Sequence, residues 1–333
     1  MNYPFRLSVA IPIRNEENTL PGLLRRLRLV LDRIEGGPHE IIFVDDGSTD
    51  QTFLILEHEA REDSRILVIS LSRNFGHQTA LTAALDHVTG DAVVIMDGDL
   101  QDSPEVIPRF IERYKDGYDV VYAQRVGRKE IWPLRLCYFV FYRLIAKLSE
   151  VYLPVDSGDF GLMSRRVVEE VRRMREHHRY LRGLRSWVGF RQIGIPVERA
   201  ERHSGRSRYG FLRLLKLAAD GIFAFSIVPI RAAALLGAAV TVLSALFVLY
   251  SLYAKLIRHE SPPGFTALLV VMAFLSGMIL FFLGVLGEYI GRIYEETKAR
   301  PLYVIDRIAG GKAWPRENQT AAHLSIRAGE DFR

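Results

Sequence analysis

The chain has 333 residues, a formal net charge of +5 and a single cysteine. One cysteine excludes an intrachain disulfide, and this length allows one large domain with a membrane segment. The apolar run Val9–Ile13 near the start is too short for a secretory signal peptide, so we expect the N-terminal part to stay in the cytoplasm.

The first half of the chain alternates short apolar runs with segments of helical period, which predicts an α/β fold with a parallel sheet and crossover helices. The predicted strands, which are apolar enough to be buried on both faces, are Leu7–Ile13, Ile41–Asp45, Ile66–Ser70, Ala92–Met96 and Val120–Ala123. The predicted helices are Pro21–Ile34, Asp50–Glu62, Gln78–His87 and Pro104–Lys115. Two of them begin with proline, which suits the first turn of a helix.

Polar, acid-rich turns follow three of these strands, at Pro12–Glu17, Val44–Asp50 and Met96–Asp102. Each turn alone would be ordinary. In an open parallel sheet, however, ligands bind outside the carboxyl ends of the strands, so we expect the three turns to converge on one site.

Two carboxylates, Asp97 and Asp99, flank Gly98 in the third turn. Oxygen ligands of this kind favour Mg²⁺ or Mn²⁺, whose remaining positions are filled by water and substrate phosphates. No Gly-x-Gly-x-x-Gly pattern follows the first strand and there is no P-loop, which disfavours a dinucleotide or P-loop site. The turn therefore predicts a metal–diphosphate site.

Two uncharged apolar runs, Ala232–Leu252 and Phe265–Gly287, are each long enough to cross ~30 Å of hydrocarbon as a helix. They predict a two-helix transmembrane hairpin within 229–291, with spans at about 230–254 and 265–288. Lys and Arg residues outside both spans favour cytoplasmic termini, although two cations in the connecting loop weaken this bias. We therefore expect a multi-pass protein with residues 1–228 and a tail, 292–333, in the cytoplasm.

Two further segments, at about 131–150 and 209–226, mix aromatic and leucine residues with cations, as amphipathic helices at a membrane interface do. For the first, packing on the sheet is an equal alternative. Between Arg172 and Lys216, thirteen Lys and Arg residues face only three acids. Beside membrane spans, such a region predicts contact with lipid headgroups and phosphates, and no nucleic acid; we expect most of these cations to lie on the surface.

These patterns resemble family 2 glycosyltransferases with the GT-A (Rossmann-like) nucleotide-sugar fold. More narrowly, the chain resembles the polyprenyl-phosphate glycosyltransferases, the group of dolichol-phosphate mannose synthase, in its bacterial branch with two transmembrane helices. The matching pieces are Pro12–Glu16, Val44–Asp50, Ser72–Gly76, Met96–Glu105, Asp159–Met163 and Glu201–Tyr209. The resemblance covers roughly residues 7–226 and the two-span tail.

The resemblance implies an inverting transfer of a sugar from a nucleotide sugar to a polyprenyl (undecaprenyl or dolichyl) phosphate at the inner (plasma) membrane. A UDP-sugar donor is favoured, as UDP-glucose or another UDP-hexose; GDP-mannose is the alternative. A processive polysaccharide synthase is disfavoured, because more spans and a Gln-x-x-Arg-Trp motif are missing. A non-catalytic nucleotide-binding scaffold is disfavoured by the intact acids. Small residues such as Gly284 and Gly287 permit close helix packing, within the hairpin or in a homo-oligomer.

The resemblance also implies roles for individual residues. The metal is held by Asp97 and Asp99, with Gln101 as a weaker third ligand. The donor pocket is lined by residues of the first two turns, Pro12, Asn15, Glu16, Asp45 and Asp46. The arginines near the active site are Arg125 and Arg128, and the residues expected at the diphosphate or the acceptor phosphate are Arg202 and Ser207. His77 stands where relatives often carry lysine and is assigned no role.

Asp159 is the catalytic base by resemblance, and we expect it just before an apolar turn that ends at Ser164. The acceptor phosphate, however, has a second pKa near ~6 and is largely deprotonated at pH 7. General-base help would then contribute less than usual. The alternative is that Asp159 positions the acceptor or the donor sugar.

Overall fold

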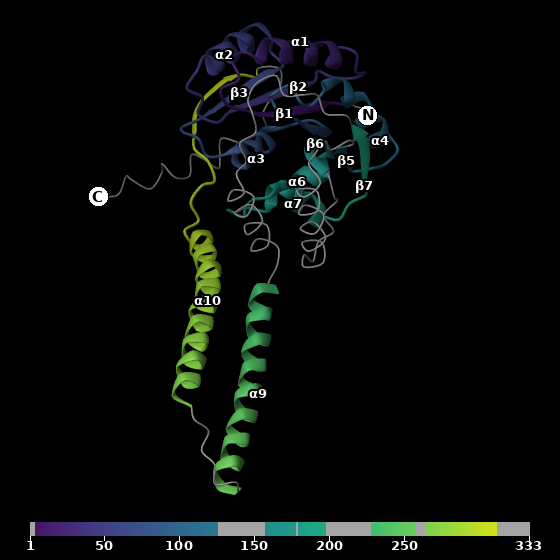
Figure 1. The fold of residues 1–333 in the computed structure, drawn as a ribbon. Coiled ribbons are helices and arrows are strands. Elements are labelled where there is room, and N and C mark those ends of the chain that lie inside the picture. The colour runs from purple at the N-terminus through teal and green to yellow at the C-terminus, as the bar shows by residue number, and fades with distance from the viewer. Residues whose placement is uncertain (1–3, 126–156, 178, 198–227, 258–263, 312–333) are drawn as a thin grey trace, which may run out of the picture.

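The computed structural model describes residues 4–125, 157–177, 179–197, 228–257 and 264–311. A sheet flanked by helices forms one end of the molecule, and two long helices extend from it (Figure 1). Of the predicted features, the two interfacial helices and the last residues of the tail lie outside the described residues.

The sheet has eight strands within the described residues, in the order β7-β5-β6-β4-β1-β2-β3-β8. The strands are β1 (Leu7–Ile13), β2 (Glu40–Asp45), β3 (Ile66–Leu71), β4 (Ala92–Ile95), β5 (Val120–Arg125), β6 (Ser157–Ser164), β7 (Gln192–Val197) and β8 (Ile305–Gly310). The first four are neighbours and parallel. Strand β5 runs in the same direction but is separated from β4 by the antiparallel β6. All five predicted strands are therefore confirmed.

Helices cover both faces of the sheet. They are α1 (Leu20–Leu31), α2 (Thr52–Glu62), α3 (His77–His87), the short η1 (Pro104–Val106), α4 (Ile107–Lys115), α6 (Arg165–Arg173) and α7 (Leu181–Trp187). One apolar core joins α1, α2 and α4 to one face, and a second joins α3, α6 and α7 to the other. Successive residues of a strand point to opposite faces of the sheet, so Val9 packs in one core and Ala10 in the other. Because both faces are buried, the strand sequences are continuous apolar runs.

The expectation that Asp159 precedes a turn is wrong, because this segment is strand β6 in the middle of the sheet. Phe160 and Leu162 enter one core and Met163 the other. Gly161 makes the pairing with β5 possible, since a Cβ there would lie 2.5 Å from the carbonyl oxygen of Val121. Glycine weakens the sequence signal of a strand while it allows this close approach.

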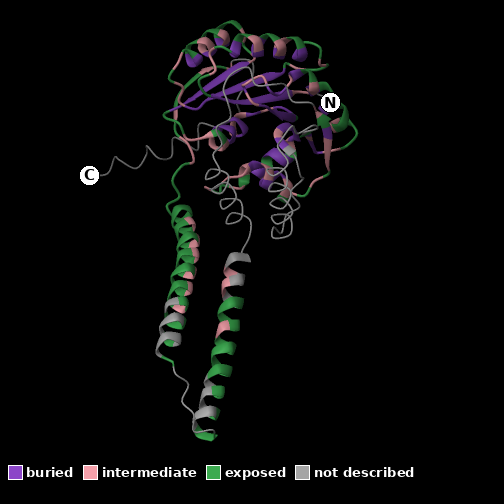
Figure 2. Cartoon of the chain, viewed as in Figure 1, coloured by how far each residue is buried: buried purple, intermediate pink, exposed green. Residues whose placement is uncertain are grey.

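The two C-terminal apolar runs lie in helices α9 (Val228–Ile257) and α10 (Phe265–Thr297). Both helices are mostly exposed where the structure describes their side chains (Figure 2), with Leu243 66% and Leu280 69% accessible. Within the described residues, Phe274–Thr297 is long and apolar enough to cross a membrane, whereas Leu235–Phe247 is a shorter apolar segment. Two spans therefore remain a prediction.

After α10 the chain returns to the sheet, which the sequence did not predict. Strand β8 pairs with β3 in antiparallel register, and Gly311 donates a hydrogen bond to the Ile66 carbonyl (2.9 Å). The Tyr303 hydroxyl donates to Asp86 on α3 (2.9 Å), and Glu296 at the end of α10 accepts from the His177 amide (2.7 Å). Residues before α9 and after α10 thus share one sheet.

A substitution at Gly310 tests how much strand β8 stabilises the fold. Gly310 has φ +77°, and an added Cβ would lie 2.3 Å from the Ile66 carbonyl oxygen. We predict that Gly310→Val costs about 2 kcal/mol through backbone strain and clash, which lowers Tm by roughly 4–8 °C. Thermal unfolding in detergent measures this. Ile308→Val on the exposed side of β8 is the control, and equal Tm values for both variants would contradict the prediction.

Candidate active site

Hydrogen bonds hold the turns after β1, β2 and β4 together. The Asn15 amide donates to Ser48 Oγ (3.0 Å), and Asn15 Oδ1 accepts from the Thr49 amide (2.8 Å). The Thr19 hydroxyl lies 3.3 Å from the Gly98 carbonyl oxygen. The three acid-rich turns therefore lie side by side at the carboxyl edge of the sheet.

Most side chains predicted to line the donor pocket are engaged in shaping these turns. Glu16 Oε2 accepts from the Thr19 hydroxyl (2.8 Å), and Asn15 has a positive φ of 54°. Asp45 accepts from the Ser48 amide (3.1 Å) and is buried, and Pro12 is a buried residue of β1. Their contact with a nucleotide stays a prediction, but they fix the backbone on which a donor would rest.

Asp46 fixes the loop between β3 and α3. Its two carboxylate oxygens accept hydrogen bonds from the Phe75 amide (2.7 Å) and the Gly76 amide (3.0 Å). Burial raises the pKa of Asp46, against the opposing effect of these two bonds. Gly76 has φ +99° and is followed directly by His77, the first residue of α3. A buried carboxylate thus sets the position of His77.

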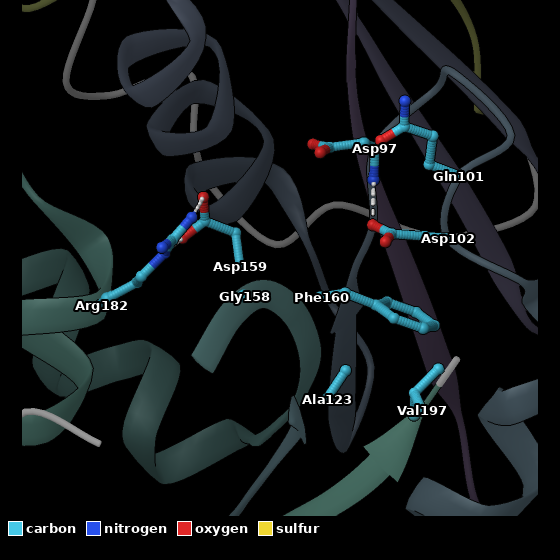
Figure 3. Close-up of a pocket in the computed structure, with 9 residues that line it drawn as sticks. All are labelled: Asp97, Gln101, Asp102, Ala123, Gly158, Asp159, Phe160, Arg182 and Val197. Carbon is cyan, nitrogen blue, oxygen red and sulfur yellow. Dashed lines mark hydrogen bonds and ion pairs between the residues drawn. The ribbon is translucent and has the colours of Figure 1, made fainter. Parts of the chain in front are cut away.

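A pocket opens between the turn after β4 and the ends of β5, β6 and β7 (Figure 3). Its lining residues are Asp97, Gln101, Asp102, Ala123, Gly158, Asp159, Phe160, Arg182 and Val197. The carboxylate of Asp97 points toward the side of the pocket where Asp159 lies. The pocket therefore places a predicted metal ligand and the predicted base within one small volume.

Asp159 is paired with Arg182 of α7. Arg182 donates from Nε to Oδ1 (2.7 Å) and from Nη2 to Oδ2 (3.0 Å), and the Asp159 side chain is only 10% exposed. Burial by itself raises the pKa of Asp159, but the hydrogen bonds and charge of Arg182, with His77 and Arg185, more than offset this and leave the pKa below its ordinary value. Asp159 is thus held as a carboxylate.

His77 lies between the two acids. Its Nε2 is 3.7 Å from Asp97 Oδ1 and 3.9 Å from Asp159 Oδ2, and its side chain is 45% exposed. The sequence predicted no role for His77, yet the structure places it within 4 Å of both acids.

Comparisons with known proteins identify the family of the chain. The model of a protein family described as "Glycosyl transferase family 2" matches residues 8–172. An uncharacterized glycosyltransferase of Bacillus subtilis is 41% identical, over 93% of this chain and 96% of that protein. The bactoprenol glucosyl transferase of Shigella phage SfX is 39% identical, over 90% of this chain and 98% of that protein. The chain belongs to glycosyl transferase family 2.

Membership of the family agrees with the GT-A type of α/β fold expected from the sequence. Another relative, an uncharacterized glycosyltransferase of Synechocystis, is 39% identical over 93% of this chain and 98% of that protein. Among solved structures, S. aureus TarS 1-349 in complex with UDP-GlcNAc has a TM-score of 0.44 and 19% identity, over 66% of this chain and 67% of that chain. That likeness is too distant to carry a functional argument.

The turn after β4 suits a family 2 transferase that uses a divalent metal. Asp97 and Gln101 face the pocket, whereas Asp99 is not among the lining residues and accepts from the Gln101 amide (3.1 Å). Within the described part of the chain, no group of three or more His, Cys, Asp or Glu side chains gathers to hold a metal. The oxygen donors fit an ion that takes few protein ligands and completes its shell with a diphosphate.

Four other predicted site residues lie at the end of a described segment or outside the described residues. Arg125 is the last residue of β5, and Arg128, Arg202 and Ser207 lie outside the described residues. Their roles stay predictions.

The basic region contributes more to the interior than we expected. Arg182 lines the pocket, and Arg185 is 3% exposed beside the Tyr122 ring (5.2 Å). Arg172 donates to the carbonyls of Leu85 (2.6 Å) and Val88 (2.7 Å) at the end of α3. The spacing of Arg182 and Arg185, three residues apart between apolar positions, was the signal available in the sequence.

Asp46 provides a test of how the β3–α3 loop is held. Asp46→Ala leaves two inward amides without their acceptor, which costs about 1–3 kcal/mol for each buried group. We predict a lower Tm and a transferase kcat at least about tenfold lower, because the loop that carries His77 is released. Asp116→Ala, which removes an exposed carboxylate, is the control. Wild-type kcat and Tm in the Asp46 variant would refute this assignment.

Proposed function

We propose that this protein transfers glucose from UDP-glucose to a polyprenyl phosphate. The similarity to bactoprenol glucosyl transferases carries the proposal, because the 39% identity to the Shigella phage protein covers 98% of that protein's length. It therefore includes the helices α9 and α10 as well as the sheet domain. Family 2 transferases invert the anomeric configuration, which fits a direct displacement by the acceptor.

The pocket supports a donor that carries a diphosphate. We propose that Mg²⁺ or Mn²⁺ is held at the turn after β4 by Asp97, with Asp99 and Gln101 of the same turn. When bound, the metal stabilises the negative charge of the leaving nucleotide diphosphate. The turns after β1 and β2, shaped by Asn15, Glu16, Asp45 and Asp46, lie beside it and would carry the nucleoside.

The acceptor side of the proposal is supported by the exposed apolar surface of α9 and α10. Large side chains such as Phe247 (66% exposed) and Phe281 (68% exposed) are mostly uncovered by the described part of the chain. Surfaces of this kind mark contact with lipid or another protein. A polyprenyl phosphate is a membrane lipid with a phosphate at the surface, and helices in the bilayer would hold the enzyme where that phosphate is accessible.

Strand β8 supports a topology with both ends of the helical pair on one side of the membrane. Residues on both sides of α9–α10 pair in the same sheet, so a chain that crosses the bilayer must cross it an even number of times. We propose two spans in the inner (plasma) membrane, with the sheet domain and both termini in the cytoplasm.

A transfer assay tests the reaction. Purified protein in detergent receives undecaprenyl phosphate, Mg²⁺ or Mn²⁺, and radiolabelled UDP-glucose, UDP-N-acetylglucosamine or GDP-mannose in separate reactions. We predict that label enters the organic phase from UDP-glucose, and that Asp97→Ala lowers the rate about 100-fold or more. Asp116→Ala is the matched control. Transfer from GDP-mannose alone would show that GDP-mannose, and not UDP-glucose, is the donor. The absence of lipid product with every donor would refute the function.

Cysteine labelling tests the topology. After Cys137→Ser, a cysteine is introduced by Ser261→Cys between the two helices or by Thr297→Cys at the end of α10. We predict that a membrane-impermeant maleimide added outside spheroplasts labels position 261 but not 297, and that lysis exposes 297. Labelling of neither position before lysis would contradict two crossings.

A further inference from the structure

Both members of an ion pair, Asp159 and Arg182, line the pocket. They line it together with Asp97, and two hydrogen bonds fix the guanidinium against the carboxylate. Arg182 is the more exposed partner, at 26% against 10% for Asp159. Figure 3 shows the pair on the opposite side of the pocket from Gln101 and Asp102.

The frame around this pair is rigid. Leu181, the neighbour of Arg182, is buried and donates its amide to Gln78 Oε1 on α3 (2.9 Å). Leu184 is also buried, so α7 is anchored on both sides of Arg182. Asp159 projects from the central strand β6. The direction of the guanidinium is therefore set by elements that cannot easily move.

Asp159 is poorly suited to remove a proton. Both of its oxygens accept hydrogen bonds from a guanidinium, and its pKa lies below the ordinary value although burial opposes this. A general base works best when its pKa is near the working pH. The charge of Arg185, a further cation nearby, adds to the positive potential at the carboxylate.

The proposed acceptor also has no proton to give up. A phosphate monoester is mostly a dianion at pH 7, since its second pKa is about 6. In the displacement, one dianion oxygen forms a bond to the anomeric carbon, and the bond from that carbon to the β-phosphate oxygen breaks. The electron pair leaves with UDP, the acceptor becomes a phosphodiester, and no proton is transferred. The chemical need is a cation that holds the dianion near the pocket acids.

We propose that Arg182 binds the acceptor phosphate and that Asp159 is a positioning residue, which aims the Arg182 guanidinium and does not act as a base. The inference rests on the proposed function and specifies how its acceptor is recognised. Guanidinium groups bind phosphate through paired hydrogen bonds and keep their charge. Arg182 presents such a group in the pocket that Asp97 also lines, where the donor's anomeric carbon would lie next to the metal-bound diphosphate.

A double-mutant cycle tests the proposal. The variants are Arg182→Gln, Arg182→Lys, Asp159→Asn, and Arg182→Gln combined with Asp159→Asn, with Arg173→Gln on the exposed face of α6 as the control. For each, kcat and the KM values for undecaprenyl phosphate and UDP-glucose are measured separately. The double variant removes both charges together, so it leaves no unpaired buried ion. UDP binding and Tm show that each variant is folded.

We expect Arg182→Gln to raise the acceptor KM about 10- to 100-fold, the range of a lost charged hydrogen bond, with the UDP-glucose KM unchanged within about twofold. Arg182→Lys should recover part of this loss. Asp159→Asn should raise the same KM, and adding it to Arg182→Gln should cost nothing more, because Asp159 acts through Arg182.

Other results would overturn the inference. If Asp159→Asn lowers kcat about 100-fold or more even with Arg182→Gln present, Asp159 is a base. If the UDP-glucose KM rises and the acceptor KM does not, Arg182 binds the donor diphosphate. If folded wild-type protein makes no lipid product, the proposed function itself fails. This outcome is seen with the wild-type protein alone, whereas the two outcomes above are differences between variants.

Discussion

The candidate site depends on how polar groups at the end of a buried sheet find partners. The strands are covered on both faces, so the turns that follow them must satisfy their own amides and carbonyls. The Asn15 side chain accepts a hydrogen bond from an amide of the second turn. The Asp46 side chain, in the second turn, accepts from two amides of the loop before α3. Because each turn holds the next, the edge of the sheet becomes a rigid rim. The pocket beside it receives residues from β5, β6 and α7.

Charge balance gives this rim its chemistry. Asp97 and Asp102 make one side of the pocket negative, which suits a metal ion, while Arg182 compensates Asp159 on the other. Burial lowers the pKa of Arg185 to about 10, which shows how strongly its site is desolvated. A buried cation is retained at a cost unless a negative group is near. With the proposed metal on one side and Arg182 on the other, each of two anionic substrates would meet a cation.

The sequence predicted the parts of the fold that have local signals. Strands β1 to β5 are largely apolar runs, α1 to α4 have a helical period, and prolines stand at the start of α1, η1 and α4. Strand β6 was missed because Gly161 and Asp159 interrupt its apolar pattern, although both are needed there. No local pattern in the sequence of β8 indicates that it pairs with β3, because β3 lies more than 200 residues earlier. Arg182 was hidden among many cations, because only the fold shows which of them faces Asp159.

Strand β8 also relates the long helices to the pocket. Tyr303 is bonded to Asp86 near the last turn of α3, and the first residue of that helix is His77 between the two pocket acids. A helix of 11 residues is a rod about 16 Å long. Glu296 of α10 holds the amide of His177, in the segment that leads into α7 and Arg182. The elements that carry His77 and Arg182 are thus tied to the end of α10 and to the segment that follows it. With α10 in a bilayer, these ties would fix the height of the pocket above the membrane, and so the depth at which a lipid phosphate must be presented to Arg182.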